Sequence, residues 1–288
     1  MKLIQKHFPN LEFKKTKMMR KGCDNDVVVL DNRLIFRFPK SEDCTRRFQA
    51  EVKLLKHLKE RVNLAIPNYI YLPGDRSFGG YEMLKGQEMR SSLFKKLSTE
   101  KKQKIARQIG IFLSVLHSTQ ITIAEKAGLP HLKEKYWYSR YSVSKRYEKI
   151  KTLLFPRLSK IEVDWIQAEF EKYLSLPQSN HSAVIHGDFS SDHILFDPVT
   201  AKITGILDFT DMQIAAPESE FGKLWKYGEE FLEEVVEAYK PPLSPHWKEK
   251  SKFTTKADII TLMYNLMEEK DFIIFEKIRK KLNQLMKK

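Results

Sequence analysis

The fold is decided by His186-Gly187-Asp188-Phe189-Ser190-Ser191-Asp192-His193-Ile194-Leu195-Phe196, which is followed by Ile206-Leu207-Asp208-Phe209. An apolar run over 194–196, a polar turn over 197–202 that contains a proline, and a second apolar run over 203–207 predict a β-hairpin. Because a hairpin returns the chain to where it started, the two ends of the motif meet in space. We therefore expect Asp188, His193 and Asp208 to face one cavity.

Three polar side chains in this order suit the transfer of a phosphoryl group to a hydroxyl. The protein must place the hydroxyl, accept its proton and hold metal ions against the phosphates of the nucleotide. Asp188 is the candidate general base, and His193 and Asp208 are candidate metal ligands. An isolated H-x-D triplet occurs by chance in many proteins, but here base, second ligand, hairpin and final aspartate appear in order. The pattern indicates a nucleotide-dependent small-molecule O-phosphotransferase.

The motif resembles the H-G-D-x-x-x-x-N and D-F-G arrangement of the protein-kinase-like antibiotic phosphotransferases. The run over 188–197 is most similar to the aminoglycoside 2''-O-phosphotransferases, and the resemblance extends over most of the chain. It implies that Asp188 is the catalytic base and that His193, where most kinases have Asn, and Asp208 hold Mg²⁺. An imidazole is a softer ligand than an amide oxygen, which leaves Mn²⁺ as an alternative metal. A bond from His193 to a neighbouring backbone or carboxylate group is the alternative role.

The resemblance implies an α+β, bilobal protein-kinase-like fold, with a small N-terminal antiparallel-sheet lobe and a larger, mostly helical C-terminal lobe. A chain of 288 residues with 42% hydrophobic residues can bury the core that this needs. We expect a nucleotide-binding lobe over 1–85, with the hinge at its end, and a C-terminal lobe over 86–288. The second lobe would comprise a catalytic core over about 86–125 and 181–225 and a helical acceptor-binding subdomain over about 126–180 and 226–288.

The nucleotide phosphates are expected beside an arginine of the first lobe. Arg37 is a lone charge in an apolar strand over 34–38, and the helix that follows, near 46–58, supplies Glu51 as its partner. By the resemblance, Arg37 takes the place of the third-strand lysine that holds the α and β phosphates, and Glu51 orients it. Lys40 is the competing candidate. A solvent-facing Arg37 and Glu51 are the alternative.

The purine and the remaining phosphate contacts are expected from a loop and from the hinge. The loop that contains Gly22 and Asn25 would cover the phosphates, although a single glycine fits an ordinary turn equally well. The hinge would read the purine edge through main-chain groups of Glu82 and Leu84. By the resemblance, Tyr81 stands at the gate to the base pocket, where a bulky residue disfavours adenine in the related enzymes, so GTP is expected over ATP as the donor. An ordinary core tyrosine is the other interpretation.

The acceptor side is acidic, with nine carboxylates and two lysines between residues 208 and 237. Carboxylates suit polyamine-like antibiotics because each can pair with an ammonium group. We expect a small cationic, hydroxyl-bearing substrate to contact Asp192, Asp211, Glu229, Glu230 and Phe253. The resemblance implies phosphorylation of an aminoglycoside 2''-hydroxyl and hence antibiotic resistance, although a solvated helix face remains an alternative for the acidic run that begins at Glu229.

Three departures from the family's pattern leave the acceptor open. Thr210 replaces the glycine of D-F-G, Ala216 replaces an aspartate, and Lys226 lies where related enzymes tend to have a drug-binding carboxylate. A lysine repels an ammonium group at that position. The alternative acceptor is another antibiotic, a sugar, choline or a homoserine-like alcohol.

The net charge, the cysteine content and the apolar runs limit the partners and the cellular compartment that we expect. A net charge of +14 by itself favours a nucleic-acid or anionic-surface partner, but the lysines are spread over helical stretches such as 95–104 and 277–288. We therefore expect a solvated basic surface and no nucleic-acid partner, with a catalytically weak nucleic-acid-binding module as the alternative. Cys23 and Cys44 are too few for a disulfide framework. No apolar run approaches the length of a membrane span, so we expect a cytoplasmic monomer without a membrane partner.

Overall fold

The computed structural model describes residues 2–19, 24–130, 140–179 and 181–287. A four-stranded antiparallel sheet in the order β1-β2-β3-β4 forms the N-terminal part. Its strands are β1 (Thr16–Met19), β2 (Asn25–Leu30), β3 (Leu34–Pro39) and β4 (Gly79–Glu82), and the short helix α1 (Lys2–His7) and the long helix α2 (Glu42–Leu58) accompany them. The turn between β2 and β3 has φ near +50° at Asp31 and Asn32, a conformation that Asp and Asn tolerate.

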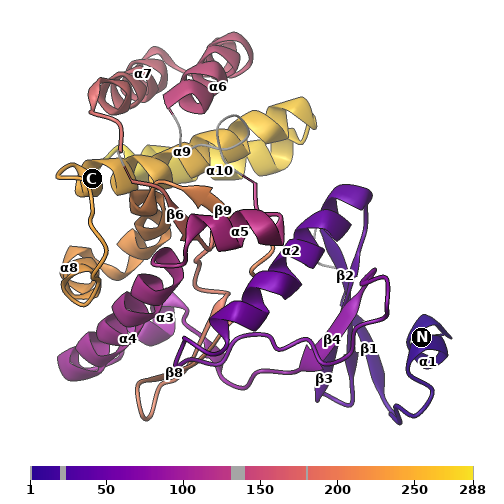
Figure 1. The fold of residues 1–288 in the computed structure, drawn as a ribbon. Helices are drawn as coiled ribbons and strands as arrows, with labels where there is room; N and C mark the ends of the chain where they lie inside the picture. The colour runs from indigo at the N-terminus through magenta and orange to yellow at the C-terminus, as the bar shows by residue number, and fades with distance from the viewer. Residues whose placement is uncertain (1, 20–23, 131–139, 180, 288) are drawn as a thin grey trace.

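The rest of the chain is mostly helical, so the predicted bilobal kinase-like fold is confirmed. Figure 1 shows the N-terminal sheet at one end of the molecule and α6 with α7 at the other. The helices are α3 (Ser91–Phe94), α4 (Thr99–His117), α5 (Ile121–Ala127), α6 (Arg140–Leu153), η1 (Phe155–Arg157), α7 (Lys160–Ser175), η2 (Pro217–Tyr227), α8 (Glu229–Glu237), α9 (Trp247–Glu268) and α10 (Phe272–Leu285). None of these described helices is long and apolar enough to cross a membrane.

The sequence of helix α4 explains where the helix begins and which of its faces is buried. The side chain of Ser98 caps its N-terminus by accepting a hydrogen bond from the backbone N–H of Lys101. Its apolar face is buried in the main core, and the residues of that face are Ile105, Ile109, Phe112, Leu113 and Leu116. A Cβ at Gly110 would lie 2.3 Å from a backbone oxygen of α8. The glycine therefore allows α4 and α8 to approach closely.

Two small sheets position the motif that decides the fold. The strands β7 (Ile194–Asp197) and β8 (Lys202–Ile206) form the predicted hairpin, with β5 (Gln87–Glu88) on its edge. The strands β6 (Ala183–Ile185) and β9 (Gln213–Ala215) form the second sheet. The backbone N–H of Leu207 donates to the carbonyl of His193 at 2.8 Å. The two ends of the motif are thus directly hydrogen-bonded.

A second apolar core joins α6 and α7 to α9 and α10. Among its fully buried members are Phe170 of α7, Met263 of α9 and Leu282 of α10. This packing separates the helical end of the molecule from the core that contains the motif. The domain boundaries expected from the sequence remain a prediction.

A buried ion pair between α7 and α10 makes the stability of this helical end depend on pH. Glu162 is the third residue of α7, where it caps the helix through Ser159, and it binds Arg279 of α10 at 2.6 Å. The hydrogen bond from Arg279 lowers the pKa of Glu162 to about 2. Because the folded-state pKa is depressed, the contribution is present above pH 4.5, the usual value, and is lost as the pH falls toward 2.

We expect Arg279→Met to lower the free energy of unfolding by up to roughly 3 kcal/mol at neutral pH. The difference between wild type and variant should shrink as the pH is lowered from about 5 to about 3. Urea unfolding at each pH measures both quantities. A difference that stays constant over this range would show that Arg279 does not set the ionisation of Glu162.

Candidate active site

Asp188, His193 and Asp208 converge. Asp188 lies in the loop between β6 and β7, His193 directly precedes β7, and Asp208 follows β8. The Nδ1 atom of His193 is 3.5 Å from Oδ2 of Asp188, and its Nε2 atom is 3.7 Å from Oδ2 of Asp208. The hairpin thus brings the predicted base and both predicted metal ligands together.

The two ring nitrogens of His193 have different partners. Nδ1 lies 2.9 Å from the backbone carbonyl of Asp188, a distance at which it must donate its proton. In a neutral imidazole the lone pair is then on Nε2, on the side of Asp208, as a metal-ligating histidine requires. The backbone bond and the metal role, which the sequence left as alternatives, are therefore compatible.

A divalent cation fits between His193 and Asp208 with ligands from outside the protein. No group of three or more His, Cys, Asp or Glu side chains with metal-binding geometry occurs among the described residues. Mg²⁺ typically takes one or two protein ligands and completes its octahedron with waters and substrate phosphates. One carboxylate and one imidazole nitrogen match that requirement.

A buried carboxylate that the sequence analysis did not single out fixes the catalytic loop. Glu220 of η2 is 3% exposed and accepts hydrogen bonds from the backbone N–H groups of His186 and Gly187. Gly187 has φ +81°, and a Cβ there would lie 2.2 Å from the backbone oxygen of Asp211. Only glycine suits this position. The sequence did not indicate this role, because Glu220 lies within an acidic run and no local pattern distinguishes it from the exposed carboxylates of that run.

His186 links this loop to the segment that contains Asp208. Its Nε2 atom lies 2.9 Å from the carbonyl of Leu207, and its ring packs 4.7 Å from that of Phe209. Burial lowers the pKa of His186. A neutral His186 therefore donates from Nε2 to the carbonyl of Leu207 and connects the loop of Asp188 to the segment that contains Asp208.

Arg37 forms the predicted ion pair with Glu51. Both side chains are buried, and Nη1 of Arg37 is 2.9 Å from Oε1 of Glu51. The other nitrogen, Nη2, is 3.0 Å from Oδ1 of Asp208 and also donates to the hydroxyl of Thr210. Burial opposes the charge, but the two carboxylates hold the pKa of Arg37 well above its usual value. Lys40, the competing candidate, instead pairs with Asp26 at 3.5 Å.

The threonine that replaces the glycine of D-F-G belongs to the same network. Its Oγ1 is 2.9 Å from Oδ1 of Asp208 and 3.2 Å from Oε2 of Glu51. A guanidinium group has five donors and needs more acceptors than an ammonium group does. Thr210 supplies one of them, so the arginine at position 37 and the threonine at position 210 are structurally matched.

Asp211, predicted for the acceptor, lies between the catalytic carboxylates and the N-terminal lobe. Burial together with nearby Asp188 and Asp208 raises the pKa of Asp211. Its Oδ1 atom is 3.2 Å from Nη1 of Arg47, a residue of α2 that also binds Asp24 at 2.8 Å. Arg47 thus connects the two lobes beside the predicted base, a contact that no local sequence pattern indicates.

A lysine contacts the predicted base directly. Nζ of Lys223, on η2, donates to Oδ1 of Asp188. Burial opposes the positive charge, but Asp188 and Asp258 raise the pKa of Lys223. Burial raises the pKa of Asp258, a residue of α9, to about 6, with Lys223 lowering it and Asp188 raising it. Lys223 and Asp258 were not identified from the sequence, which showed Lys223 only as one of two lysines in an acidic run.

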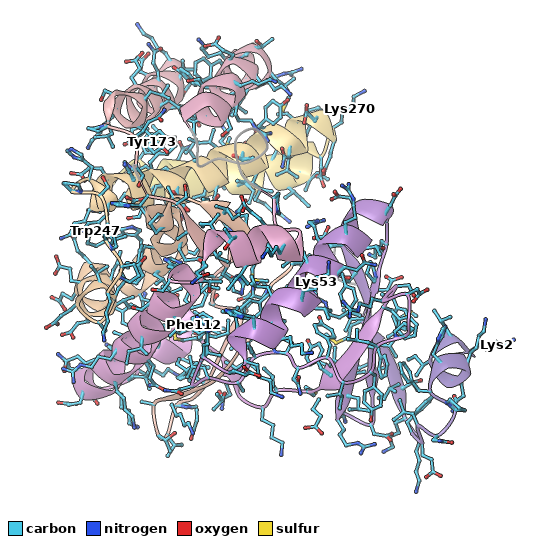
Figure 2. The ribbon with its side chains drawn as sticks, viewed as in Figure 1. Lys2, Lys53, Phe112, Tyr173, Trp247 and Lys270 are labelled. Atoms are coloured by element: carbon cyan, nitrogen blue, oxygen red, sulfur yellow. The ribbon has the colours of Figure 1, made fainter. Side chains whose placement is uncertain are left out.

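The other residues predicted for the acceptor lie on α8 and α9 and in the turn before His193. Glu229 pairs with Lys248 at 3.1 Å and with Lys252 at 3.5 Å, and Glu230 is exposed. Phe253 of α9 is buried, and its ring stacks 4.0 Å from that of Tyr173, which Figure 2 labels at the end of α7. The carboxylate of Asp192 accepts from the hydroxyl of Ser191. Of the residues predicted for the acceptor, Asp211 lies close enough to Asp188 and Asp208 for their charges to raise its pKa.

The predicted hinge and gate lie beside the Arg37 network. Tyr81 is buried, and its ring packs edge-on against that of Tyr69, whose hydroxyl lies 3.0 Å from Oε1 of Glu51. The backbone N–H of Met83 donates to the turn between β2 and β3. An open cavity of about 620 Å³ is lined by Asn32, Arg33, Glu82, Met83, Leu84, Lys85 and Gly86. Glu82 and Leu84 therefore lie at an open surface of the hinge.

The predicted phosphate loop is only partly described. Asn25 is buried at the start of β2, and its Oδ1 atom has no hydrogen-bond partner among the described residues. Gly22 lies outside the described residues. A buried acceptor without a partner is uncommon, and a bound ligand or water is one way to satisfy it.

Comparison with known proteins identifies the relatives of this chain. Residues 16–249 match the model of the family described as the phosphotransferase enzyme family. An uncharacterised protein, YcbJ of Bacillus subtilis, is 23% identical over 240 residues, which are 71% of this chain and 74% of that protein. Viomycin phosphotransferase of Streptomyces vinaceus is 27% identical over 142 residues, which are 48% of this chain and 47% of that protein.

Solved structures share the fold. The complex of APH(2'')-IIIa with GDP and kanamycin superposes with a TM-score of 0.89, at 23% identity over 98% of this chain and 96% of that one. A macrolide 2'-phosphotransferase from Brachybacterium faecium superposes with a TM-score of 0.73, at 17% identity over 98% of this chain and 97% of that one. At these identities the likeness establishes the architecture.

Proposed function

Because the chain belongs to the phosphotransferase enzyme family, we propose that it transfers the γ-phosphoryl group of GTP or ATP to an aminoglycoside hydroxyl. The convergence of Asp188, His193 and Asp208 supports this proposal most directly. The solved complex of a similar fold with GDP and kanamycin supports the choice of ligands. The 2''-hydroxyl is the expected acceptor, and modification there would confer resistance to the antibiotic.

Each residue of the site has a defined task in this proposal. Asp188 orients the acceptor hydroxyl and accepts its proton as the new bond to phosphorus forms. Arg37, held by Glu51, binds the α and β phosphates. His193 and Asp208 would hold Mg²⁺, which neutralises charge on the β and γ phosphates.

The donor and the setting of the reaction are further parts of the proposal. The purine edge meets main-chain groups of Glu82 and Leu84, and the buried ring of Tyr81 at the back of the site favours GTP over ATP. The buried side chain of Asn25 lies against the phosphates. The N-terminal lobe over 1–85 binds nucleotide, and the helical segments over 126–180 and 226–288 bind the acceptor in a cytoplasmic monomer.

A second candidate function has its own supporting observation. Lys223 contacts the proposed base, and the exposed Lys226 follows one turn later with its ammonium group 5.4 Å from the ring centre of Tyr227. Two lysines beside the acceptor site disfavour a densely cationic drug. A kinase of a less cationic alcohol, such as another antibiotic, a sugar, choline or homoserine, is therefore the alternative.

Product identification tests both functions. The protein would be incubated with Mg²⁺, with GTP or ATP, and with kanamycin, gentamicin, a macrolide, choline, homoserine or a hexose in turn. Mass spectrometry would detect one added phosphate, and phosphorus-coupled NMR would locate it. A 2''-phosphate on kanamycin or gentamicin supports the proposal. Phosphorylation of another alcohol alone would establish the second candidate in its place.

We expect the metal preference to follow residue 193. His193→Asn should keep Mg²⁺-dependent turnover within about tenfold of wild type and lower the ratio of Mn²⁺ to Mg²⁺ activity, because an amide oxygen is a harder ligand than an imidazole. His193→Ala should raise the half-activating metal concentration by about 10–100-fold. Titration of kcat with each metal measures both effects. An unchanged metal profile with full activity in His193→Ala would exclude direct ligation.

A further inference from the structure

Lys223 contacts the proposed base Asp188 and remains accessible to a substrate. Its Nζ atom donates to one carboxylate oxygen of Asp188, yet 32% of the lysine side chain and 29% of the aspartate side chain are exposed. Both side chains are thus partly open to solvent beside the proposed base, where a substrate can reach the ammonium group. The ammonium group therefore lies where an acceptor hydroxyl and an incoming phosphoryl group must meet.

The backbone that bears Lys223 is fixed by α9. A Cβ at Gly222 would lie 2.9 Å from Cβ of Thr254, so η2 and α9 touch at this point. The hydroxyl of Thr255 donates to the carbonyl of Gly222. Leu224, on the other side of the lysine, is fully buried. The backbone of Lys223 is thus fixed by the contacts of the residues on either side of it.

Phosphoryl transfer requires positive charge on the acceptor side of the site as well as on the nucleotide side. The phosphoryl group in transit is anionic, and the carboxylates of Asp211 and Asp258 both lie close enough to the proposed base Asp188 for its charge to raise their pKa. The positive groups on the nucleotide side are Arg37 and the proposed metal at His193 and Asp208. Preorganised charge of opposite sign is the main way in which such sites stabilise the transition state. On the acceptor side, Lys223 supplies that charge.

We propose that Lys223 is a catalytic residue, the acceptor-side cation of phosphoryl transfer. The inference rests on the proposed function. The acceptor oxygen forms a bond to the γ phosphorus, the bond from that phosphorus to the β–γ bridging oxygen breaks, and its electron pair stays on the nucleoside diphosphate. The hydroxyl proton passes to Asp188. Lys223 stays protonated throughout, holds the carboxylate in place and pairs with an oxygen of the moving phosphoryl group.

A set of variants separates this role from simple charge balance. Lys223→Gln keeps a hydrogen-bond donor for Asp188 but removes the charge, Lys223→Met removes both, and Lys223→Arg keeps the charge. Lys223→Met combined with Asp258→Asn restores the net charge without restoring a cation at the site. Lys160→Met, at the exposed start of α7, is the control for loss of one lysine charge. Thermal unfolding of each variant would identify any that do not fold.

Two reactions are measured, each with Mg²⁺ and GTP. The first is transfer to kanamycin, and the second is hydrolysis of GTP without an acceptor, in which water takes the acceptor's place. We expect Lys223→Gln and Lys223→Met to lower both rate constants by about 100-fold or more, with the KM for GTP within about twofold of wild type. Lys223→Arg should retain about a tenth of the activity, and the double variant should stay as slow as Lys223→Met.

The outcomes distinguish failure of the role proposed for Lys223 from failure of the proposed function. If Lys223→Gln keeps more than about a third of both rates, or if the double variant recovers the wild-type rates, Lys223 serves only to balance Asp258 and the inference is overturned. If the wild type phosphorylates no kanamycin but its hydrolysis falls in Lys223→Gln, the acceptor is wrong and the inference holds. A wild type that neither transfers nor hydrolyses would overturn both.

Discussion

Asp188→Asn will lower kcat for phosphoryl transfer by roughly 10²–10⁴-fold and leave nucleotide affinity within about twofold of wild type. The amide has nearly the shape of the carboxylate but cannot accept the hydroxyl proton. The nucleotide contacts proposed for Arg37 and the hinge do not involve Asp188. Single-turnover kinetics would give the rate of the chemical step, and calorimetry with GDP would give the affinity.

The control for Asp188→Asn is the same change at Asp164, an exposed residue of α7 that is remote in sequence from the motif. Asp164→Asn should leave both quantities as they are. A turnover in Asp188→Asn above about a tenth of wild type would show that another group accepts the proton. A parallel loss of nucleotide affinity would show that Asp188 supports the nucleotide site as well.

Arg37→Met will destabilise the protein by about 3–5 kcal/mol, because it leaves the carboxylates of Glu51 and Asp208 without their buried cation. The same change should raise the KM for the nucleotide and lower kcat, since the proposed contact with the α and β phosphates is lost. Urea unfolding measures the first effect, and steady-state kinetics with varied GTP measures the second.

A double variant separates stability from nucleotide binding. Arg37→Met with Glu51→Leu removes both partners of the buried pair, and such replacements recover much of the stability that single removal costs. The KM for GTP should stay high in the double variant if Arg37 binds the phosphates. Recovery of both stability and KM would reduce Arg37 to a structural role.

The sequence predicted those parts of the molecule that local pattern determines. The hairpin over β7 and β8 and the pair of Arg37 with Glu51 follow from spacing along a strand or helix, and both are present. The return strand spans Lys202–Ile206, shifted by one residue from the predicted range, and the bond from the N–H of Leu207 to His193 lies one pair beyond Ile194 and Ile206 in the same register.

Contacts between distant segments could not be predicted in this way. Glu220 beside the catalytic loop, Lys223 against Asp188 and Arg47 against Asp211 join residues that are 33 to 164 positions apart. Periodicity identifies the buried face of an element but not its partner. The acidic run after Asp208 appeared uniform in sequence, yet Glu220 is buried under the loop and Glu229 is paired with two lysines of α9.

The bond from Arg37 to Thr210 couples these two positions. Arg37→Lys would leave the threonine hydroxyl with one donor fewer, and Thr210→Gly would leave a buried guanidinium N–H without its acceptor. Each single change weakens the molecule, whereas the two changes together need not. A redesign of this site should therefore change both positions at once.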